Sequence, residues 1–193
     1  MNNKLEWQLK KERRLHECRI FDLYTYKMEH NKQEADFFIL KAPHWVSIIP
    51  VLSFETGELL MVRQYRHGIG KITCEFPAGL VEVNEEPFKA AQRELLEETG
   101  YRAEEWYLLA TNSPAPAFMN NCCYTFLATK LSNTGKVSPD EHEKIESIHI
   151  NLKTVMEKLG TDEFINSQTM ISAMTLERYL EGKKGADRIR TGA

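Results

Sequence analysis

Three glutamates in the middle of the chain have the spacing that joint chemistry requires. Glu94, Glu97 and Glu98 stand at positions i, i+3 and i+4, so on a helix their side chains share one face. Like charges at this spacing destabilise a helix, and a bound cation removes the penalty. Clustered carboxylate oxygens are the ligands that Mg²⁺ and Mn²⁺ prefer. The spacing indicates a divalent-metal site, although a solvated acidic helix face fits the three glutamates alone at least as well.

Neighbouring residues extend this candidate site. Arg93 precedes Glu97 by four residues and can brace its carboxylate away from the metal face. Glu85 lies near the start of the same helix, where the helix dipole favours a negative charge. Gly79 closes a Pro-Ala-Gly turn, which can let a backbone carbonyl approach a metal.

Segment 79–101, GLVEVNEEPFKAAQRELLEETGY, resembles the Nudix box, G-x5-E-x7-R-E-U-x-E-E-x-G-U, in which U is a bulky apolar residue. The positions that match it are Gly79, Glu85, Arg93, Glu94, Leu95, Glu97, Glu98 and Gly100. Tyr101 stands at the last U, where an aliphatic residue is more usual. Seven fixed residues, each with a frequency of about one in fifteen, coincide by chance on the order of once in 10⁸ windows.

The resemblance implies a fold, a metal and a set of site residues. The implied fold is α/β, an α/β/α sandwich around a mixed sheet. Glu94 and Glu98 would be the main metal ligands, with a backbone oxygen of Ala78, and the implied cofactor is Mg²⁺ or alternatively Mn²⁺. Glu97 and Arg93 would belong to the catalytic set beside them. Metals bridging two phosphates would neutralise charge and activate a water for in-line attack at phosphorus.

Residues on either side of the box resemble the ADP-ribose pyrophosphatase branch of the Nudix family. A Q-Y-R strand at 64–66 leads into an E-x-P-A-G turn at 75–79. Pro116 stands fifteen residues beyond Tyr101, near the offset at which this branch carries a proline. The usual glycine and acidic residue after that proline are absent, because residues 117–120 read AFMN. The identity of the sugar is therefore left open.

Five residues are candidates for binding the substrate: Arg66, Glu75, Arg19, Phe21 and Phe118. Arg66 could grip a phosphate through two parallel hydrogen bonds, although a surface arginine in a strand fits its position equally well. Arg19 and Phe21 could stack on a nucleobase, and Phe118 could shape a pocket. Ordinary packing of the hairpin and of the loop is the alternative for these three.

The base that activates water is expected outside the box, because a bound cation makes a carboxylate a poor base. The polar loop 132–144 carries Glu141 and Glu143 just before an expected strand. In the resembled branch a glutamate from the corresponding loop acts as the base. Glu141 is therefore assigned as the base and Glu143 as a further metal ligand, with the two roles interchangeable. A solvated acidic loop is the alternative.

Apolar alternation and turn residues predict the elements that position these side chains. Strands are expected at 18–28, 35–40, 46–53, 58–65, 72–76, 106–111, 123–130 and 145–152. Helices are expected at 87–99, 152–159 and 167–181. Pro87 and Gly100 suit the two ends of the first helix. Met170, Ala173, Leu176 and Leu180 form the apolar stripe expected on the last helix.

The chain is predicted to comprise an N-terminal antiparallel β element at 1–45, the Nudix hydrolase domain at 46–182 and a flexible tail at 183–193. In the resembled branch an N-terminal sheet is exchanged across a dimer and helps to hold the nucleobase. A homodimer is therefore expected.

Composition limits the other classes. With 42% hydrophobic and 27% charged residues, the chain is typical of a folded soluble protein. A net charge of −3 is too weak to indicate a nucleic-acid or membrane partner, and the sequence has neither a membrane-length apolar run nor a secretory signal at its start. The four cysteines lack metal-ligand spacing, so reduced thiols and a cytoplasmic location are expected.

The sequence thus predicts Mg²⁺-dependent hydrolysis of the pyrophosphate of ADP-ribose or a related nucleoside diphosphate sugar, giving a nucleoside monophosphate and a sugar phosphate. A GDP-sugar or a dinucleotide coenzyme is an alternative substrate. The remaining alternative is a non-catalytic ligand-sensing module, which the complete set of box glutamates disfavours.

Overall fold

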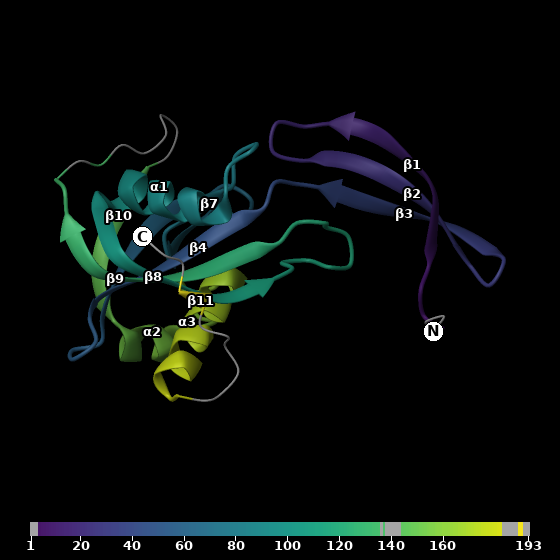
Figure 1. Ribbon diagram of the computed structural model, residues 1–193. Coiled ribbons are helices and arrows are strands. Elements are labelled where there is room, and N and C mark those ends of the chain that lie inside the picture. Colours follow the sequence, from purple (N-terminus) through teal and green to yellow (C-terminus); the bar gives the residue numbers. More distant parts are fainter. Residues whose placement is uncertain (1–3, 136, 138–143, 183–188, 191–193) are drawn as a thin grey trace. The chain divides into compact units, whose positions relative to one another are not determined.

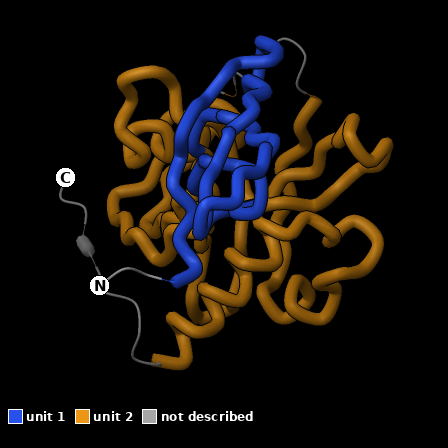
Figure 2. Tube along the Cα trace, turned by 90° about the vertical axis from the view of Figure 1, so that its right-hand side faces the viewer, with its two compact units in different colours: residues 1–44, 113–122 blue, residues 45–112, 123–193 orange. Residues whose placement is uncertain are grey.

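The computed structural model describes residues 4–135, 137, 144–182 and 189–190 (Figure 1). The chain forms two compact units (Figure 2). Unit 1 comprises residues 1–44 and 113–122, and unit 2 comprises residues 45–112 and 123–193.

Unit 1 contains a three-stranded antiparallel sheet of β1 (Gln8–Glu17), β2 (Asp22–His30) and β3 (Gln33–Lys41), in that order (Figure 1). The hairpin of β2 and β3 was predicted. Its turn residues Asn31 and Lys32 have φ of 48° and 66°, as a two-residue hairpin turn requires. Strand β1 was not predicted, because its residues are mostly charged and all are exposed. The predicted start of β2 was too early, since Cys18 and Phe21 lie in the turn after β1.

The segment 113–122 pairs with the end of β3. The Leu40 N–H donates to the Phe118 carbonyl at 2.8 Å, and the Asn120 N–H donates to the Leu40 carbonyl at 3.3 Å. The Asn120 side-chain oxygen accepts from the Ala42 N–H at 3.2 Å. These bonds explain why this loop belongs to unit 1, although it stands about seventy residues further along the chain.

Unit 2 is built on an eight-stranded sheet with the order β10-β5-β4-β9-β8-β11, in which β6 pairs with β5 and β7 pairs with β4. The strands are β4 (Trp45–Ser53), β5 (Glu58–Arg66), β6 (Lys71–Glu75), β7 (Ala78–Leu80), β8 (Tyr101–Asn112), β9 (Cys123–Asn133), β10 (Ile145–Asn151) and β11 (Ile189–Arg190). Strands β4 and β9 are parallel and the other pairs are antiparallel, so the sheet is mixed, as predicted. The short strand β7 was not predicted.

In the described part of the chain, three helices cover the two faces of this sheet, α1 (Pro87–Thr99) on one face and α2 (Leu152–Lys158) and α3 (Ser167–Leu180) on the other (Figure 1). Two separate hydrophobic cores result. Ile48 of β4 belongs to the core with α1, and its neighbour Ile49 belongs to the core with α2 and α3. The predicted α/β/α sandwich is confirmed.

Both ends of α1 lie where the sequence predicted them. Pro87 is in the first turn, and Gly100 has φ 74° and donates its N–H to the Leu96 carbonyl at 2.8 Å. On α3, Leu176 is buried as expected, but Leu180 is 48% exposed because the helix ends there. Among the described residues, no helix is long and apolar enough to cross a membrane.

Candidate active site

A buried glutamate on α1 faces the turn that precedes it. Strand β7 pairs with β4, which places Ala78 opposite Ser47 at the centre of the sheet. The Ala78 N–H donates to the Glu98 carboxylate at 3.1 Å, and Glu98 is only 3% exposed. A buried carboxylate is costly unless charged or polar partners surround it, which marks Glu98 as more than a solvated helix residue.

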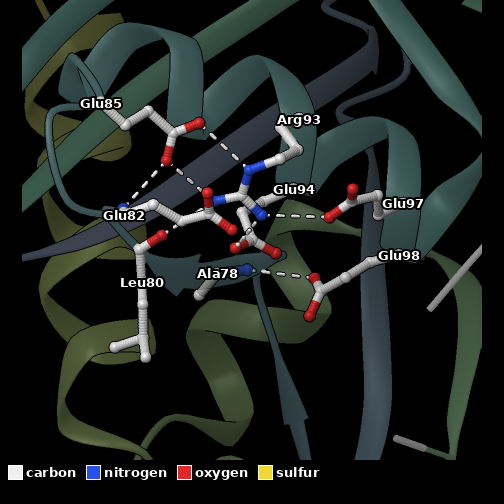
Figure 3. A network of polar contacts seen from close by, with 8 residues as sticks. All are labelled: Ala78, Leu80, Glu82, Glu85, Arg93, Glu94, Glu97 and Glu98. Atoms are coloured by element: carbon white, nitrogen blue, oxygen red, sulfur yellow. Dashed lines mark hydrogen bonds and ion pairs between the residues drawn. The ribbon is translucent and has the colours of Figure 1, made fainter. Parts of the chain in front are cut away.

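Glu94 lies against the same turn. A Cβ atom on Gly79 would collide with the Glu94 carboxylate, so only glycine leaves room for that group. The carboxylates of Glu94 and Glu98 both point toward the backbone of Ala78 (Figure 3). The box glycine therefore serves a close approach of side chain to backbone.

Arg93 holds most of the remaining acidic groups. Its Nε and Nη2 donate to the two Glu85 oxygens at 3.1 and 3.0 Å, and Nη2 also donates to the Leu80 carbonyl at 2.9 Å. Its Nη1 donates to Glu94 at 2.8 Å and to Glu97 at 3.0 Å (Figure 3). The hydrogen bond from Arg93 lowers the pKa of Glu85.

The expected contact of Arg93 with Glu97 is present. Arg93 also contacts Glu94, so the expectation that it stays off the metal face was wrong.

The network fits a cation by its charge and its donor chemistry. Four glutamates, 85, 94, 97 and 98, against the single positive charge of Arg93 leave a formal charge of −3. Within the described ranges, no group of three or more His, Cys, Asp or Glu side chains is arranged to hold a metal ion. Arg93 explains part of this arrangement, because it holds Glu94 and Glu97. A bound cation would add to these contacts through carboxylate oxygens, which suit a hard cation.

Gly79→Ala is expected to weaken Mg²⁺ binding by about 10- to 100-fold, because the added methyl group displaces the Glu94 carboxylate. The melting temperature should change little, since the end of a flexible side chain can move. Isothermal titration with Mg²⁺ measures the first effect and thermal denaturation the second. Gly68→Ala is the matched control, because a Cβ there meets nothing within 4 Å. Equal Mg²⁺ affinity in both variants would show that Glu94 is not a metal ligand.

A second polar network joins β5, β6 and the start of α3. Arg66 donates from Nε and Nη2 to the two Glu75 oxygens at 2.9 and 2.8 Å, and Thr73 donates its hydroxyl to Glu75 at 2.5 Å. Burial raises the pKa of Glu75, but Arg66, Thr73 and a hydrogen bond from Asn166 outweigh burial and hold the pKa below its usual value. The edge of Arg66 that could grip a phosphate is thus engaged by Glu75.

Arg66→Met is expected to lower the melting temperature at pH 7 by about 3–8 °C, because the variant leaves the buried Glu75 carboxylate without its cation. Wild-type Glu75 has a lowered pKa, so it stabilises the fold above the unfolded pKa of about 4.3 and loses this effect as pH falls through the folded pKa. In the variant, burial raises that pKa, so the destabilisation grows as pH rises and is relieved as pH falls toward 4.3.

Melting temperatures measured from pH 4.5 to 8 test whether the destabilisation by Arg66→Met grows as pH rises. The double variant Arg66→Met/Glu75→Gln has no buried charge to titrate and should lose the added pH dependence. A constant difference between Arg66→Met and the wild type across this range would show that Glu75 is not held ionised by Arg66.

The other candidates belong to unit 1 or lie outside the described residues. Arg19, Phe21 and Phe118 belong to unit 1, where Arg19 is exposed and Phe118 is 47% exposed. Glu141 and Glu143 lie outside the described residues.

Sequence reasoning missed two residues that hold Glu75. Thr73 stands two positions before it on β6, so strand alternation could have placed both side chains on one face. Asn166 comes from the start of α3, and no local pattern connects it with β6.

Comparisons with known proteins match one family model and several named relatives. A family model described as NUDIX domain matches residues 43–167. The ADP-ribose pyrophosphatase of Bacillus subtilis (strain 168) is 31% identical over 170 residues, covering 86% of this chain and 91% of that protein. The methanol dehydrogenase activator of Bacillus methanolicus is 30% identical over 148 residues, covering 76% and 79%.

A solved structure shares the fold. The crystal structure of an ADP compounds hydrolase superposes with a TM-score of 0.82 at 21% identity, covering 95% of this chain and 99% of the other. The similarity extends over both units described above.

Proposed function

The chain belongs to the NUDIX family, and on that premise we propose that it hydrolyses the pyrophosphate of ADP-ribose or a related nucleoside diphosphate sugar with a divalent cation, Mg²⁺ before Mn²⁺. The products are a nucleoside monophosphate and a sugar phosphate. The observation that carries the proposal is the placement of Glu94 and Glu98 against the Ala78–Gly79 turn, in a network with a formal charge of −3. The relative named ADP-ribose pyrophosphatase supports the substrate class.

The residues of the box, and Ala78 just before it, have separate roles in the proposed reaction. Glu94, Glu98 and a backbone oxygen of Ala78 hold the cation, which when bound neutralises phosphate charge and lowers the pKa of a coordinated water. Arg93 orients Glu94 and Glu97 through Nη1 while Glu85 fixes the other edge of its guanidinium group. Glu97 belongs to the proposed catalytic set, next to the metal ligands Glu94 and Glu98.

Substrate contacts and the base complete the proposal. Arg66 brings positive charge toward the phosphates, and Glu75 acts as a positioning residue that fixes the guanidinium group. Glu141 is the proposed base and Glu143 a further metal ligand. Arg19, Phe21 and Phe118 are the proposed contacts to the nucleobase and sugar.

A substrate panel tests the proposal. Each compound is incubated with Mg²⁺, and phosphate is measured after a phosphatase has cleaved the monophosphate products. ADP-ribose and ADP-sugars should be hydrolysed fastest. Faster hydrolysis of a GDP-sugar or a dinucleotide coenzyme would assign that compound as the substrate instead of ADP-ribose. No hydrolysis of any compound, with tight binding of one, would favour a ligand-sensing module.

We also propose a homodimer, supported by one face of the unit 1 sheet. The strand register of β2 and β3 places a continuous apolar set on one face: Tyr24, Tyr26, Met28, Ala35, Phe37 and Ile39. Phe37 is 40% exposed, and its ring meets that of Trp7 at 5.3 Å between centroids. The opposite face carries the charged Lys27 and Asp36 together with Phe38. An apolar sheet face that is only partly covered favours burial against a second copy.

Phe37→Glu is expected to convert the dimer to a monomer and to raise KM for ADP-ribose, because a charge would have to be buried on the apolar face. Phe38→Glu is the matched control, since Phe38 is the next residue on the opposite face and is 63% exposed. Light scattering at micromolar concentration measures the mass of each variant. A wild-type monomer, or an undisturbed dimer in Phe37→Glu, would refute the proposed interface.

A cytoplasmic location is the remaining proposal. All four cysteines are free thiols. Free thiols are typical of a reducing compartment, which supports this location.

A further inference from the structure

Gln64 of β5 is buried with an unused donor. It is 8% exposed, and among the described residues its side-chain Nε2 has no hydrogen-bond partner. Leaving a buried amide donor unpaired is costly, and most buried polar groups in proteins are paired. An unpaired amide at this place needs an explanation.

The strand register places Gln64 beside the Arg66–Glu75 ion pair. In the ladder of β5 and β6, Gln64 is opposite Thr73, and this pair lies between the Arg66–Lys71 pair and the Val62–Glu75 pair. The Arg66 side chain crosses this interval to reach Glu75. Gln64 therefore lies on the same face of the sheet as the guanidinium group.

The same face of β5 lies next to the C-terminal end of α1, the helix that carries Glu94 and Glu98. Val62, two residues before Gln64, is opposite Ser147 of β10. The Ser147 hydroxyl donates to the Glu98 carbonyl at 3.4 Å. Successive residues on one face of a strand are about 6–7 Å apart, so Gln64 stands between the Glu98 end of α1 and Arg66.

We propose that Gln64 is a substrate-positioning residue whose side-chain amide donates a hydrogen bond to an oxygen of the bound diphosphate. The unpaired donor requires an acceptor, and the oxygens of a diphosphate accept hydrogen bonds from such donors. This inference rests on the proposed function, because it takes the diphosphate as the ligand. It adds a neutral donor between the metal-binding carboxylates and the arginine.

Gln64→Met separates this role from a structural one. Methionine has a similar volume but no donor, so removing a buried Nε2 that has no partner is expected to leave the melting temperature unchanged or to raise it. Affinity for a non-hydrolysable α,β-methylene analogue of ADP-ribose, measured by titration calorimetry with Mg²⁺ present, should fall about tenfold or more. Gln64→Glu, which places an acceptor and a negative charge near the diphosphate, should weaken binding further.

Gln168→Met is the matched control. Gln168 is a partly buried glutamine of α3 that accepts from Asn112 at 3.2 Å and donates to Thr125 at 3.1 Å. Its replacement should lower the melting temperature and leave the affinity for the analogue unchanged.

The outcomes are distinguishable. If the wild type binds the analogue and Gln64→Met binds it equally well, the role of Gln64 is refuted and the proposed function stands. A lower melting temperature with unchanged affinity in Gln64→Met would make Gln64 structural. If the wild type neither binds the analogue nor hydrolyses ADP-ribose, the proposed function fails and the inference falls with it.

Discussion

Glu98→Gln is expected to lower kcat by about 10³-fold. The substitution keeps the shape of the side chain, and its carbonyl oxygen can still accept from the Ala78 N–H. It removes the negative charge that a hard cation requires at this buried position. The fold should persist, because the change relieves a buried charge without creating a cavity.

Steady-state kinetics at saturating Mg²⁺, with a melting curve for each protein, measure this effect. Glu86→Gln is the control, because Glu86 precedes the same helix, is exposed and makes no side-chain cap hydrogen bond. It removes the same formal charge and should keep kcat within about twofold, since exposed single charges contribute little. Full activity of Glu98→Gln would contradict the assignment of Glu98 as a metal ligand.

Replacing the base is expected to have an effect of similar size. The box carboxylates interact with Arg93 and the Ala78 N–H, and a bound cation would lower their basicity further. The proton of the attacking water therefore needs another acceptor. Of Glu141→Gln and Glu143→Gln, the base variant should lose about 10²–10⁴ in kcat with nearly unchanged Mg²⁺ affinity. The other variant should bind Mg²⁺ more weakly.

Measurements of kcat against pH and of Mg²⁺ affinity distinguish the two glutamates. The base variant should lose the acidic limb of the pH profile, because that limb reports protonation of the base. Glu146→Gln is the control, since Glu146 forms an exposed ion pair with Arg63 at 3.2 Å on the following strand. If Glu141→Gln and Glu143→Gln both act at the wild-type rate, the loop is not catalytic.

Local signals predicted the parts of the fold that local physics controls. Helix α1 has a proline at its start and a left-handed glycine at its end, and both boundaries were correct. The hairpin of β2 and β3 and the sheet strands with regular apolar alternation were found in the same way. The i, i+4 spacing of Glu94 and Glu98 predicted one shared helix face, and on α1 both carboxylates point toward the Ala78–Gly79 turn.

Features that depend on distant contacts could not be predicted. Strand β1 is mostly charged and pairs with β2, so it has no alternating apolar pattern to detect. The segment 113–122 joins unit 1 through backbone bonds that carry no sequence signature. Arg66 was expected to be available for a phosphate, but Glu75 engages two of its nitrogens, because Thr73 and Asn166 fix that carboxylate.

The most direct test of the central claim is product analysis of ADP-ribose incubated with the wild-type protein, with Mg²⁺ or with EDTA. The proposed chemistry predicts equal amounts of AMP and ribose 5-phosphate with Mg²⁺, and neither product with EDTA. Intact ADP-ribose in the presence of Mg²⁺, or equal product formation in EDTA, would contradict a metal-dependent pyrophosphohydrolase built on Glu94 and Glu98.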